Sequence, residues 1–180
     1  MSRKLLTVAA LAVIALPFST ARAQLGYGVA AGLAAPTGTL KNSVDMGYSV
    51  AGSVLFLPPL APIGFRFEGM FNQFNYKSLV IPSGKLNVLA GTANVMLTQP
   101  GIMGPYLIGG LGMYRQSTSC SGCTGNSNSK VGFNGGGGFR FGLSGFSAFA
   151  EARYHYVTGT ASATSPGSYN FIPVTFGVTF

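Results

Sequence analysis

The sequence predicts an all-β fold, an eight-stranded antiparallel up-and-down β-barrel that crosses a membrane. Three observations predict it. Only 8% of the 180 residues are charged, against about 25% in an ordinary soluble domain. Glycine contributes 27 residues, roughly twice its average share. Apolar and polar side chains alternate in segments of about ten residues between turn-forming residues, which is typical of a transmembrane barrel.

The N-terminal segment has the pattern of an export signal. Arg3 and Lys4 form a basic start, residues 5–16 are apolar, and Ala21-Arg22-Ala23 has the small residues of a cleavage site. We therefore expect residues 1–23 to be a signal peptide and residues 24–180 to be the barrel domain. The barrel domain has eight basic and three acidic side chains, a net charge of +5. This modest charge does not indicate a nucleic-acid-binding protein.

Two long uncharged stretches, 46–65 and 86–114, are candidates for membrane-spanning helices. Prolines interrupt the first stretch, and Pro100-Gly101 and Gly104-Pro105 interrupt the second. Neither stretch contains the roughly 18 consecutive apolar residues of a spanning helix. A closed barrel is the other structure that satisfies every backbone polar group in lipid.

The strands are predicted in order along the chain and are separated by connections of alternating length. Three connections, 57–63, 99–104 and 143–145, are short and rich in proline or glycine, and the other four are longer and polar. Bacterial barrels have short periplasmic turns and longer external loops, and an even strand number leaves both termini periplasmic. About 11 residues at about 3.3 Å each, tilted by about 40°, cover about 28 Å of membrane. The predicted strands are 25–34, 46–56, 64–75, 86–98, 105–116, 131–142, 146–157 and 169–180.

Alternation within the third, sixth and seventh strands predicts which face meets lipid. In the third strand, for example, Phe65 and Phe67 flank Arg66. An arginine that faces lipid in the middle of the bilayer costs about 2–4 kcal/mol. The aromatic faces must therefore point outward and the charged faces inward. The predicted inward set is Arg66, Glu68, Arg140, Glu151, Arg153 and His155.

The remaining strands carry weaker signals. Asn87 and Asn94 fall on opposite faces of the fourth strand, which requires a bulge or an exposed asparagine near one rim. The fifth strand is rich in glycine, and Arg115 indicates its orientation only weakly. The run 135–138 in the sixth strand is all glycine but lacks the lysine and helix of a phosphate-binding loop. We expect it to make room for an inward side chain such as Arg66 or Arg153, or to mark a bend.

Aromatic residues gather at both ends of the predicted strands, as in the two belts that flank the apolar band of a membrane barrel. The predicted periplasmic belt is Tyr27, Phe56, Phe65, Tyr106, Phe141, Phe146 and Phe180, and the predicted external belt is Tyr48, Tyr76, Tyr114, Tyr156 and Tyr169.

The signal peptide, the eight alternating strands and the final Phe176-Gly177-Val178-Thr179-Phe180 resemble the small outer-membrane β-barrel superfamily, which includes OmpA-like and opacity-type barrels. This resemblance implies a bacterial outer-membrane location. It also implies that Phe176, Val178 and Phe180 form the signal read by the barrel-assembly machinery. No peptidoglycan-binding domain follows the barrel in this sequence, so we expect no role in anchoring the cell wall.

The inward charges allow two interpretations. An eight-stranded barrel is only wide enough for its own side chains to fill. Because an unpaired interior charge is costly, we favour a buried plug of ion pairs and hydrogen bonds. The alternative is a narrow polar path for small solutes, or a proton-sensitive gate that uses His155.

A lipid A-modifying enzyme is a third interpretation. His155 is the only histidine, and Glu151 lies about 13 Å away along the same strand, too far for direct contact. Lipid A deacylase barrels carry a His-x-Ser pair, from which His155-Tyr156-Val157 departs, and Ser147 or Ser162 would approach only by coincidence. We therefore expect no catalytic residue, metal site or cofactor.

The predicted external loops contain two further candidate features. Cys120 and Cys123 form a CxxC motif without a second motif or a nearby histidine, so we favour a local disulfide over zinc or redox chemistry. The lysines of the barrel domain also lie in or beside these loops. They provide either ordinary solvation or contacts to lipopolysaccharide phosphates or another anionic surface ligand. These residues are Lys41, Lys77, Lys85 and Lys130.

The leading functional hypothesis is a structural or surface-interaction barrel whose external loops are the contact surface. Its expected partners are outer-membrane lipid, lipopolysaccharide, the assembly machinery and a possible surface ligand, and nucleic acid is not among them. The channel or transporter and the enzyme are the alternatives.

Overall fold

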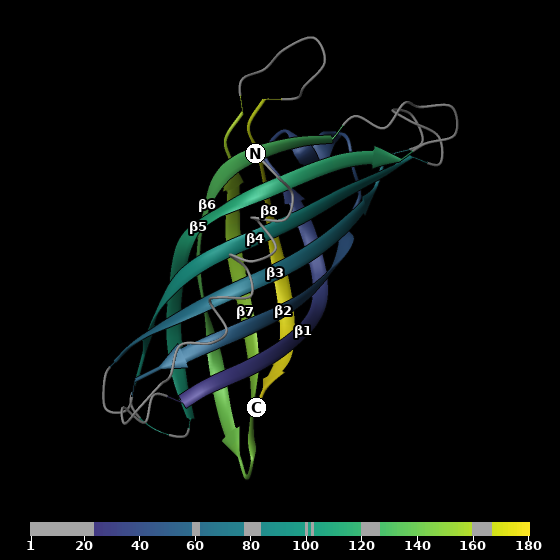
Figure 1. Cartoon of the computed structure of the whole chain (residues 1–180). Coiled ribbons are helices and arrows are strands. Elements are labelled where there is room, and N and C mark those ends of the chain that lie inside the picture. The colour runs from purple at the N-terminus through teal and green to yellow at the C-terminus, as the bar shows by residue number, and fades with distance from the viewer. Residues whose placement is uncertain are drawn as a thin grey trace, which may run out of the picture.

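The computed structural model describes residues 24–58, 62–77, 84–99, 101, 103–119, 127–159 and 167–180. These residues form a closed antiparallel barrel in which every strand pairs with its neighbours in the chain and β1 pairs with β8 (Figure 1). The predicted eight-stranded up-and-down barrel is confirmed. The strands are β1 (Gln24–Thr37), β2 (Gly47–Leu57), β3 (Ile63–Asn75), β4 (Lys85–Thr98), β5 (Met103–Ser119), β6 (Ser127–Leu143), β7 (Phe146–Val157) and β8 (Tyr169–Thr179).

The observed strand bounds differ from the predicted ones mainly in the hairpin of β5 and β6. Pairing there continues to Ser117 and Ser127, well beyond the apolar residues that defined the predicted strands. Backbone hydrogen bonds do not depend on side-chain polarity, so the hairpin continues where the alternating pattern has ended. Within the described residues, no helix has the length and hydropathy that a membrane crossing requires.

The two ends of the barrel differ. At the terminal end, β1 begins, β8 ends, and β6 turns tightly into β7 through Gly145, whose φ of 92° favours glycine. At the loop end, a short 3₁₀ helix, η2 (Leu40–Asn42), lies between β1 and β2. Val44 forms a bridge with Tyr76 just after β3, so this connection is tied to the neighbouring hairpin. Figure 1 shows the terminal end at the bottom and the loop end at the top.

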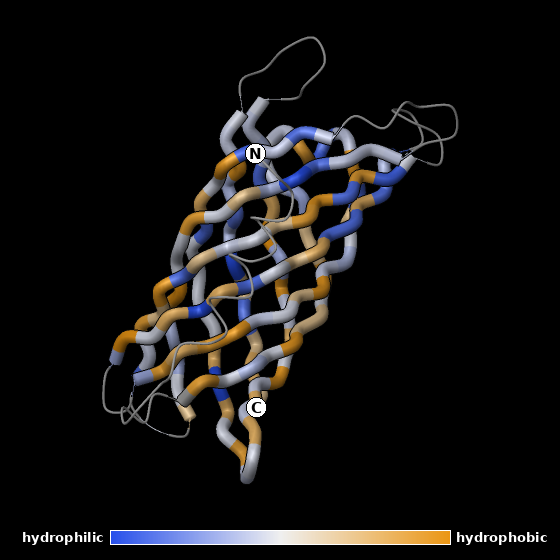
Figure 2. Tube along the Cα trace, viewed as in Figure 1, coloured by the Kyte–Doolittle hydropathy of each residue, from blue (hydrophilic) through white to orange (hydrophobic). Residues whose placement is uncertain are grey.

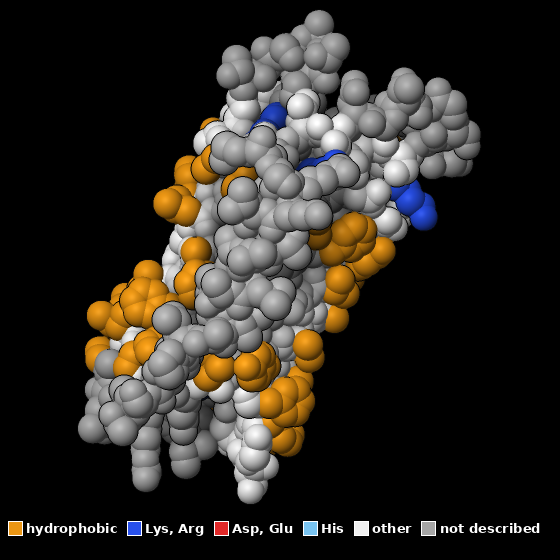
Figure 3. Space-filling view, in the orientation of Figure 1, with side chains coloured by type: hydrophobic (Ala, Val, Ile, Leu, Met, Phe, Trp, Pro, Cys, Tyr) orange, Lys and Arg blue, Asp and Glu red, His pale blue; other side chains and the backbone are white. Residues whose placement is uncertain are grey.

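The barrel is apolar outside and charged inside. Phe65 is 43% exposed and Phe67 is 59% exposed, whereas Arg66 between them is 1% exposed. Figure 2 shows the same alternation of apolar and polar residues along the strands, and Figure 3 shows apolar side chains over much of the visible wall. The arrangement is the reverse of a soluble barrel and agrees with the faces predicted from alternation.

The fourth strand contains no bulge, because its pairing with β3 is continuous from Lys85 to Leu97. Asn94 points inward and is buried, whereas Asn87 points outward near the loop end. Of the two arrangements that the sequence allowed, the strand without a bulge is therefore the one adopted, with a half-buried asparagine on the outward face near a rim. In β5 the outward Arg115 follows the inward Tyr114.

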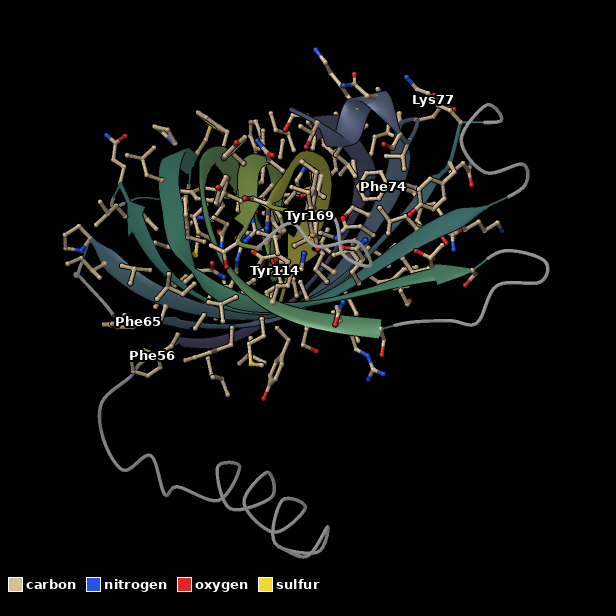
Figure 4. The ribbon with its side chains drawn as sticks, turned by 90° about the horizontal axis from the view of Figure 1, so that it is seen from above. Phe56, Phe65, Phe74, Lys77, Tyr114 and Tyr169 are labelled. Atoms are coloured by element: carbon tan, nitrogen blue, oxygen red, sulfur yellow. The ribbon has the colours of Figure 1, made fainter. Side chains whose placement is uncertain are left out.

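Four tyrosines expected in the outer belts lie inside the barrel instead, and one of them, Tyr76, packs against the buried apolar side chains near the loop end. Tyr106, Tyr114 and Tyr169 are at most 5% exposed. In Figure 4, seen from the loop end, Tyr114 and Tyr169 lie within the ring of strands, whereas Phe56 and Phe65 lie outside it. The belt prediction is wrong for these tyrosines because a ring with a polar tip suits a hydrogen-bonded interior as well as an interface.

Candidate functional site

Four side chains from opposite walls form an ion-pair ring in the barrel interior. Arg66 and Glu68 project inward from β3, and Glu151 and Arg153 project inward from β7. Arg66 Nη2 lies 2.6 Å from both Glu151 carboxylate oxygens, and its Nε lies 3.5 Å from Glu68 Oε2. Arg153 Nε lies 2.7 Å from Glu151 Oε1, and Arg153 also pairs with Glu68. Each carboxylate therefore contacts two guanidinium groups.

The ring is buried and has no net charge. Each of its four side chains is at most 4% exposed. Burying charges is costly unless attraction and hydrogen bonds compensate for the lost water. Here Tyr106 adds a further hydrogen bond by donating its hydroxyl to Glu151 Oε2 at 2.7 Å. The arrangement neutralises two arginines with two glutamates inside a wall of apolar residues.

Two asparagines and a threonine extend this polar layer. Asn94 Nδ2 donates to the Arg66 carbonyl oxygen at 3.1 Å and to Thr92 Oγ1 at 2.9 Å. Asn134 Nδ2 donates to Asn94 Oδ1 at 2.9 Å, and Asn134 Oδ1 accepts from Arg153 Nη1 at 3.5 Å. Sequence reasoning missed Asn134. The alternation of the strand could have identified it, because Asn134 and Arg140 are an even number of residues apart on β6 and so lie on the same face.

Glycines on β6 make room for the inward side chains. A Cβ at Gly136 would lie 2.7 Å from Arg153 Cα and 2.9 Å from Arg153 Cγ. A Cβ at Gly138 would lie 2.6 Å from the Tyr106 hydroxyl oxygen. The glycine run thus accommodates Arg153, as expected, and Tyr106 rather than Arg66.

Arg140 lies on the inward face but outside the ion-pair ring, so its expected membership of the interior network is wrong. It pairs in register with Phe149 near the terminal end, and its Nη2 donates to the Gly101 carbonyl oxygen at 3.2 Å. At that height the guanidinium is partly exposed and needs no buried carboxylate. The alternating pattern predicted correctly that Arg140 faces inward, but it could not predict the position of Arg140 along the barrel axis.

His155 is fully buried on the same face of β7 as Arg153, two residues closer to the loop end, and contacts no carboxylate directly. Its Nδ1 lies 2.9 Å from the Tyr114 hydroxyl, and its ring stacks on Phe171 with centroids 5.0 Å apart. Ser147 lies on the same face of β7 but close to the opposite end of that strand, and Ser162 lies outside the described residues. Ser147 is therefore too far along β7 to act as a nucleophile for His155.

Apolar clusters lie on both sides of the ion-pair ring. Toward the terminal end, the cluster is Leu55, Met96, Tyr106, Ile108 and Phe149. Toward the loop end, a larger cluster includes Val44, Phe74, Tyr114, Val157, Tyr169 and Phe171. Hydrophobic side chains therefore flank the ring on both sides. At the terminal end a cavity of about 420 Å³, whose lining includes Arg66, Tyr106 and Arg140, opens into the barrel interior.

The loop end carries a group of basic side chains that we call the basic rim: Lys41, Lys77, Lys85 and Arg115. Lys41 lies on η2, Lys77 follows β3, and Lys85 and Arg115 lie on the outward faces of β4 and β5. Figure 3 shows basic side chains at this end, and Figure 4 shows Lys77 at the periphery. Arg115 was not among the expected ligand contacts, although its position beside these lysines makes it part of the same surface.

Lys130, expected among the anionic-ligand contacts, occupies a different place from the other lysines. Its Nζ donates to the Gly167 carbonyl oxygen at 3.4 Å and lies 5.8 Å from the centroid of the Tyr169 ring. The side chain therefore lies toward β8 and the barrel opening and does not belong to the basic rim.

Other expected features are placed as follows. Phe176 and Phe180 point outward, each 67% exposed, and Val178 between them is partly buried. Cys120, Cys123 and the signal peptide 1–23 lie outside the described residues. Among the residues that the structure describes, no group of three or more His, Cys, Asp and Glu side chains comes together to hold a metal ion.

Three solved outer-membrane proteins are similar to this chain at low sequence identity. Neisserial surface protein A (NspA) is 16% identical over 86% of this chain and 95% of its own, with a TM-score of 0.66. The N-terminal β-barrel domain of Pseudomonas aeruginosa OprF is 15% identical over 88% of this chain and 100% of its own, with a TM-score of 0.49. Pseudomonas aeruginosa OprG is 14% identical over 88% and 97%, also with a TM-score of 0.49.

No protein-family model and no curated protein matches the chain. The likeness to NspA establishes the fold alone. At that level, the resemblance to small outer-membrane barrels inferred from the sequence is confirmed.

Proposed function

We propose that this chain is an outer-membrane barrel that conducts no solute and anchors a contact surface at its loop end. The outward apolar wall supports membrane insertion, because the exposed rings of β3 and β6 need hydrocarbon around them. The termini would then be periplasmic and the loop end external, the orientation usual for such barrels. Gln24, the expected first residue after signal cleavage, is also the first residue of β1.

The observation that carries the non-conducting role is the enclosed ion-pair ring. A polar path needs a continuous line of hydrated groups, and here apolar clusters lie on both sides of the charged layer. Opening such a path would require the ion pairs to separate, and Glu151 now lies 2.6 Å from Arg66 and 2.7 Å from Arg153. The same enclosure opposes an enzyme that uses His155, because a lipid substrate would have to displace the cluster around Phe171.

The basic rim supports a surface-contact role. In the described residues, the two glutamates are neutralised inside the barrel, and Asp45 is the acidic side chain that remains at the loop end. The rim therefore presents positive charge where phosphates of outer-leaflet lipopolysaccharide, or an anionic surface ligand, would be met. Phe176, Val178 and Phe180 would serve earlier, as the signal read by the assembly machinery.

Planar-bilayer recording tests the non-conducting role. Refolded barrels should give no stable conductance steps, with a porin measured in the same bilayers as the positive control. Stable, high conductance would contradict the proposal and favour the channel alternative. Mass analysis of lipid A incubated with the barrel addresses the enzyme alternative, and we expect its acyl chains to be unchanged.

A further inference from the structure

The outward surface has a groove that crosses the middle of β2, β3 and β4 and continues over β5 to Val131 of β6. Gly52 pairs with Gly69, and Gly69 pairs with Gly91, so three outward positions without side chains lie in one row. A Cβ at any of the three would meet nothing within 4 Å. The depression has a volume of about 670 Å³, and its apolar walls include Val54, Phe67, Ala93 and Leu111.

Polarity rises in steps from this groove toward the loop end. Three successive outward residue pairs join β3 and β4. The first pair is apolar, the second consists of two amide side chains, and the third consists of an amide and a lysine. Gln73 Nε2 donates to Asn87 Oδ1 at 2.8 Å, and Asn87 Nδ2 donates to Ser119 Oγ at 3.4 Å, so the amides form a ladder across neighbouring strands. In order, the pairs are Phe71 with Leu89, Gln73 with Asn87, and Asn75 with Lys85.

Part of the basic rim lies directly beyond these amides. Lys85 ends the outward row of β4, and Lys77 follows the end of β3. Arg115 lies on β5 opposite Leu89, with its Nη2 donating to Ser127 Oγ at 3.0 Å. The backbone N–H of Lys77 donates to the Ser43 carbonyl oxygen at 3.0 Å, which ties the η2 connection to this hairpin. Lys77 and Lys85 thus lie at the loop end of this wall, and Arg115 lies at the level of Leu89, between them and the groove.

The spacing fits a lipid in one leaflet. Gly91 and Lys85 are six residues apart on β4, roughly 20 Å along the strand and about 15 Å along the membrane normal at a tilt near 40°. One leaflet of a bilayer has a hydrocarbon thickness of about 15 Å. An acyl chain bound in the groove would therefore bring its headgroup to the level of Lys85, and the chain would pass Arg115 on the way.

We propose that this wall binds a phosphorylated glycolipid of the lipid A type. An acyl chain occupies the groove beside Gly69 and Gly91, the amide ladder of Gln73 and Asn87 meets the polar linkages of the chains, and a phosphate lies against the cations above. The inference rests on the proposed function, which places the loop end in the outer leaflet. A second copy of the chain fits less well, because two barrels in the same membrane would bring like charges together at this wall.

Filling the groove with larger side chains tests whether it binds an acyl chain. Gly69→Leu combined with Gly91→Leu should fold, because both sites are open, and should weaken binding of purified lipid A to the detergent-solubilised barrel. We expect a loss of at least about fivefold in affinity, equal to roughly one or two buried methylenes. Gly135→Leu is the matched control, since Gly135 is also outward with nothing within 4 Å but does not line the groove. Its affinity should match the wild type.

Native mass spectrometry can report both binding and folding. If the double leucine variant folds poorly, Gly69→Ala with Gly91→Ala gives a smaller filling and should give a smaller loss. Lipid A affinity that is unchanged in the folded groove variants would overturn the inference.

Charge variants and altered lipids test the headgroup contact. Lys85→Gln with Arg115→Gln should weaken lipid A binding, and added salt should reduce the difference from the wild type. Dephosphorylated lipid A should bind the wild type as weakly as lipid A binds this variant. Phosphatidylglycerol that binds as tightly as lipid A would contradict the glycolipid assignment.

These results separate the two proposals. Loss of binding in the glutamine variant but not in the groove variants would support the proposed surface role and reject acyl-chain binding in the groove. Conductance in planar bilayers would reject the proposed function whatever the lipid results.

Discussion

At the scale of single residues, the interior charges depend on one another. Glu151 contacts Arg66 and Arg153 and also accepts the Tyr106 hydroxyl. Removing one member of a buried pair leaves its partner charged in a low-dielectric site, which costs more than the intact pair contributes. The ring is therefore most sensitive at the residue that contacts two opposite charges.

Glu151→Ala should lower the free energy of unfolding by about 3–5 kcal/mol, because two buried guanidinium groups lose their shared partner. Urea unfolding in detergent micelles, followed by gel migration, measures the change. Asp45→Ala, which removes an exposed carboxylate at the loop end, is the control and should change stability by less than about 0.5 kcal/mol. Equal losses in the two variants would show that the ring has no special role.

Sequence alternation predicted the inward direction of the charged residues but not their partners. Arg66 and Glu151 come from strands far apart in the chain, and only barrel closure brings them together. Arg140 shows the limit of the method, since a period of two gives the face of a residue and not its depth. Tyr106 was misplaced because a tyrosine near a strand end is equally suited to a lipid interface and to a buried hydrogen bond.

At the scale of elements, β6 has two different faces. Gly136 faces inward against Arg153, while the next residue toward the loop end, Gly135, faces outward into open space. The same residue type therefore meets a tight constraint on one face and none on the other. This contrast makes neighbouring positions of one strand a matched pair for mutation.

Gly136→Ala should destabilise the barrel by about 1–3 kcal/mol, because the new Cβ would lie 2.2 Å from the Ala152 carbonyl oxygen. Gly135→Ala should leave stability unchanged or raise it by about 0.4–1 kcal/mol through the lower entropy of the unfolded chain. Parallel urea titrations of the two variants compare them directly. A Gly136→Ala barrel as stable as Gly135→Ala would contradict the close packing.

Strand positions were the most predictable feature of the elements. β7 was predicted as 146–157 and is observed as Phe146–Val157, because polar and apolar residues alternate over its full length. The outer parts of β5 and β6 were missed because Ser117, Ser127 and their neighbours are polar on both faces. Side-chain polarity reports a membrane boundary, whereas backbone pairing can continue beyond it.

At the scale of the whole molecule, charge is segregated by location. Four charges cancel in the interior, the outward wall is apolar, and the basic rim holds most of the remaining positive charge. Such a particle is stable only where hydrocarbon surrounds its middle.

The folded barrel should therefore resist detergent in the cold and unfold only on heating. Unboiled samples should migrate faster than boiled ones in a dodecyl sulfate gel, and circular dichroism in mild detergent should be rich in β-structure. Dilution without detergent is the control, and there we expect aggregation. Identical migration before and after boiling would contradict a closed barrel of this kind.

Closure of the sheet by its first and last strands also constrains how the protein is made. Tyr27 and Phe180 exchange backbone hydrogen bonds of 3.0 and 2.8 Å, so the seam joins the earliest and latest parts of the barrel to be synthesised. Every shorter nascent chain keeps an open edge that is ready to pair with another polypeptide. The barrel can close only after β8 has been synthesised, so the chain must be held apart from its neighbours until that moment.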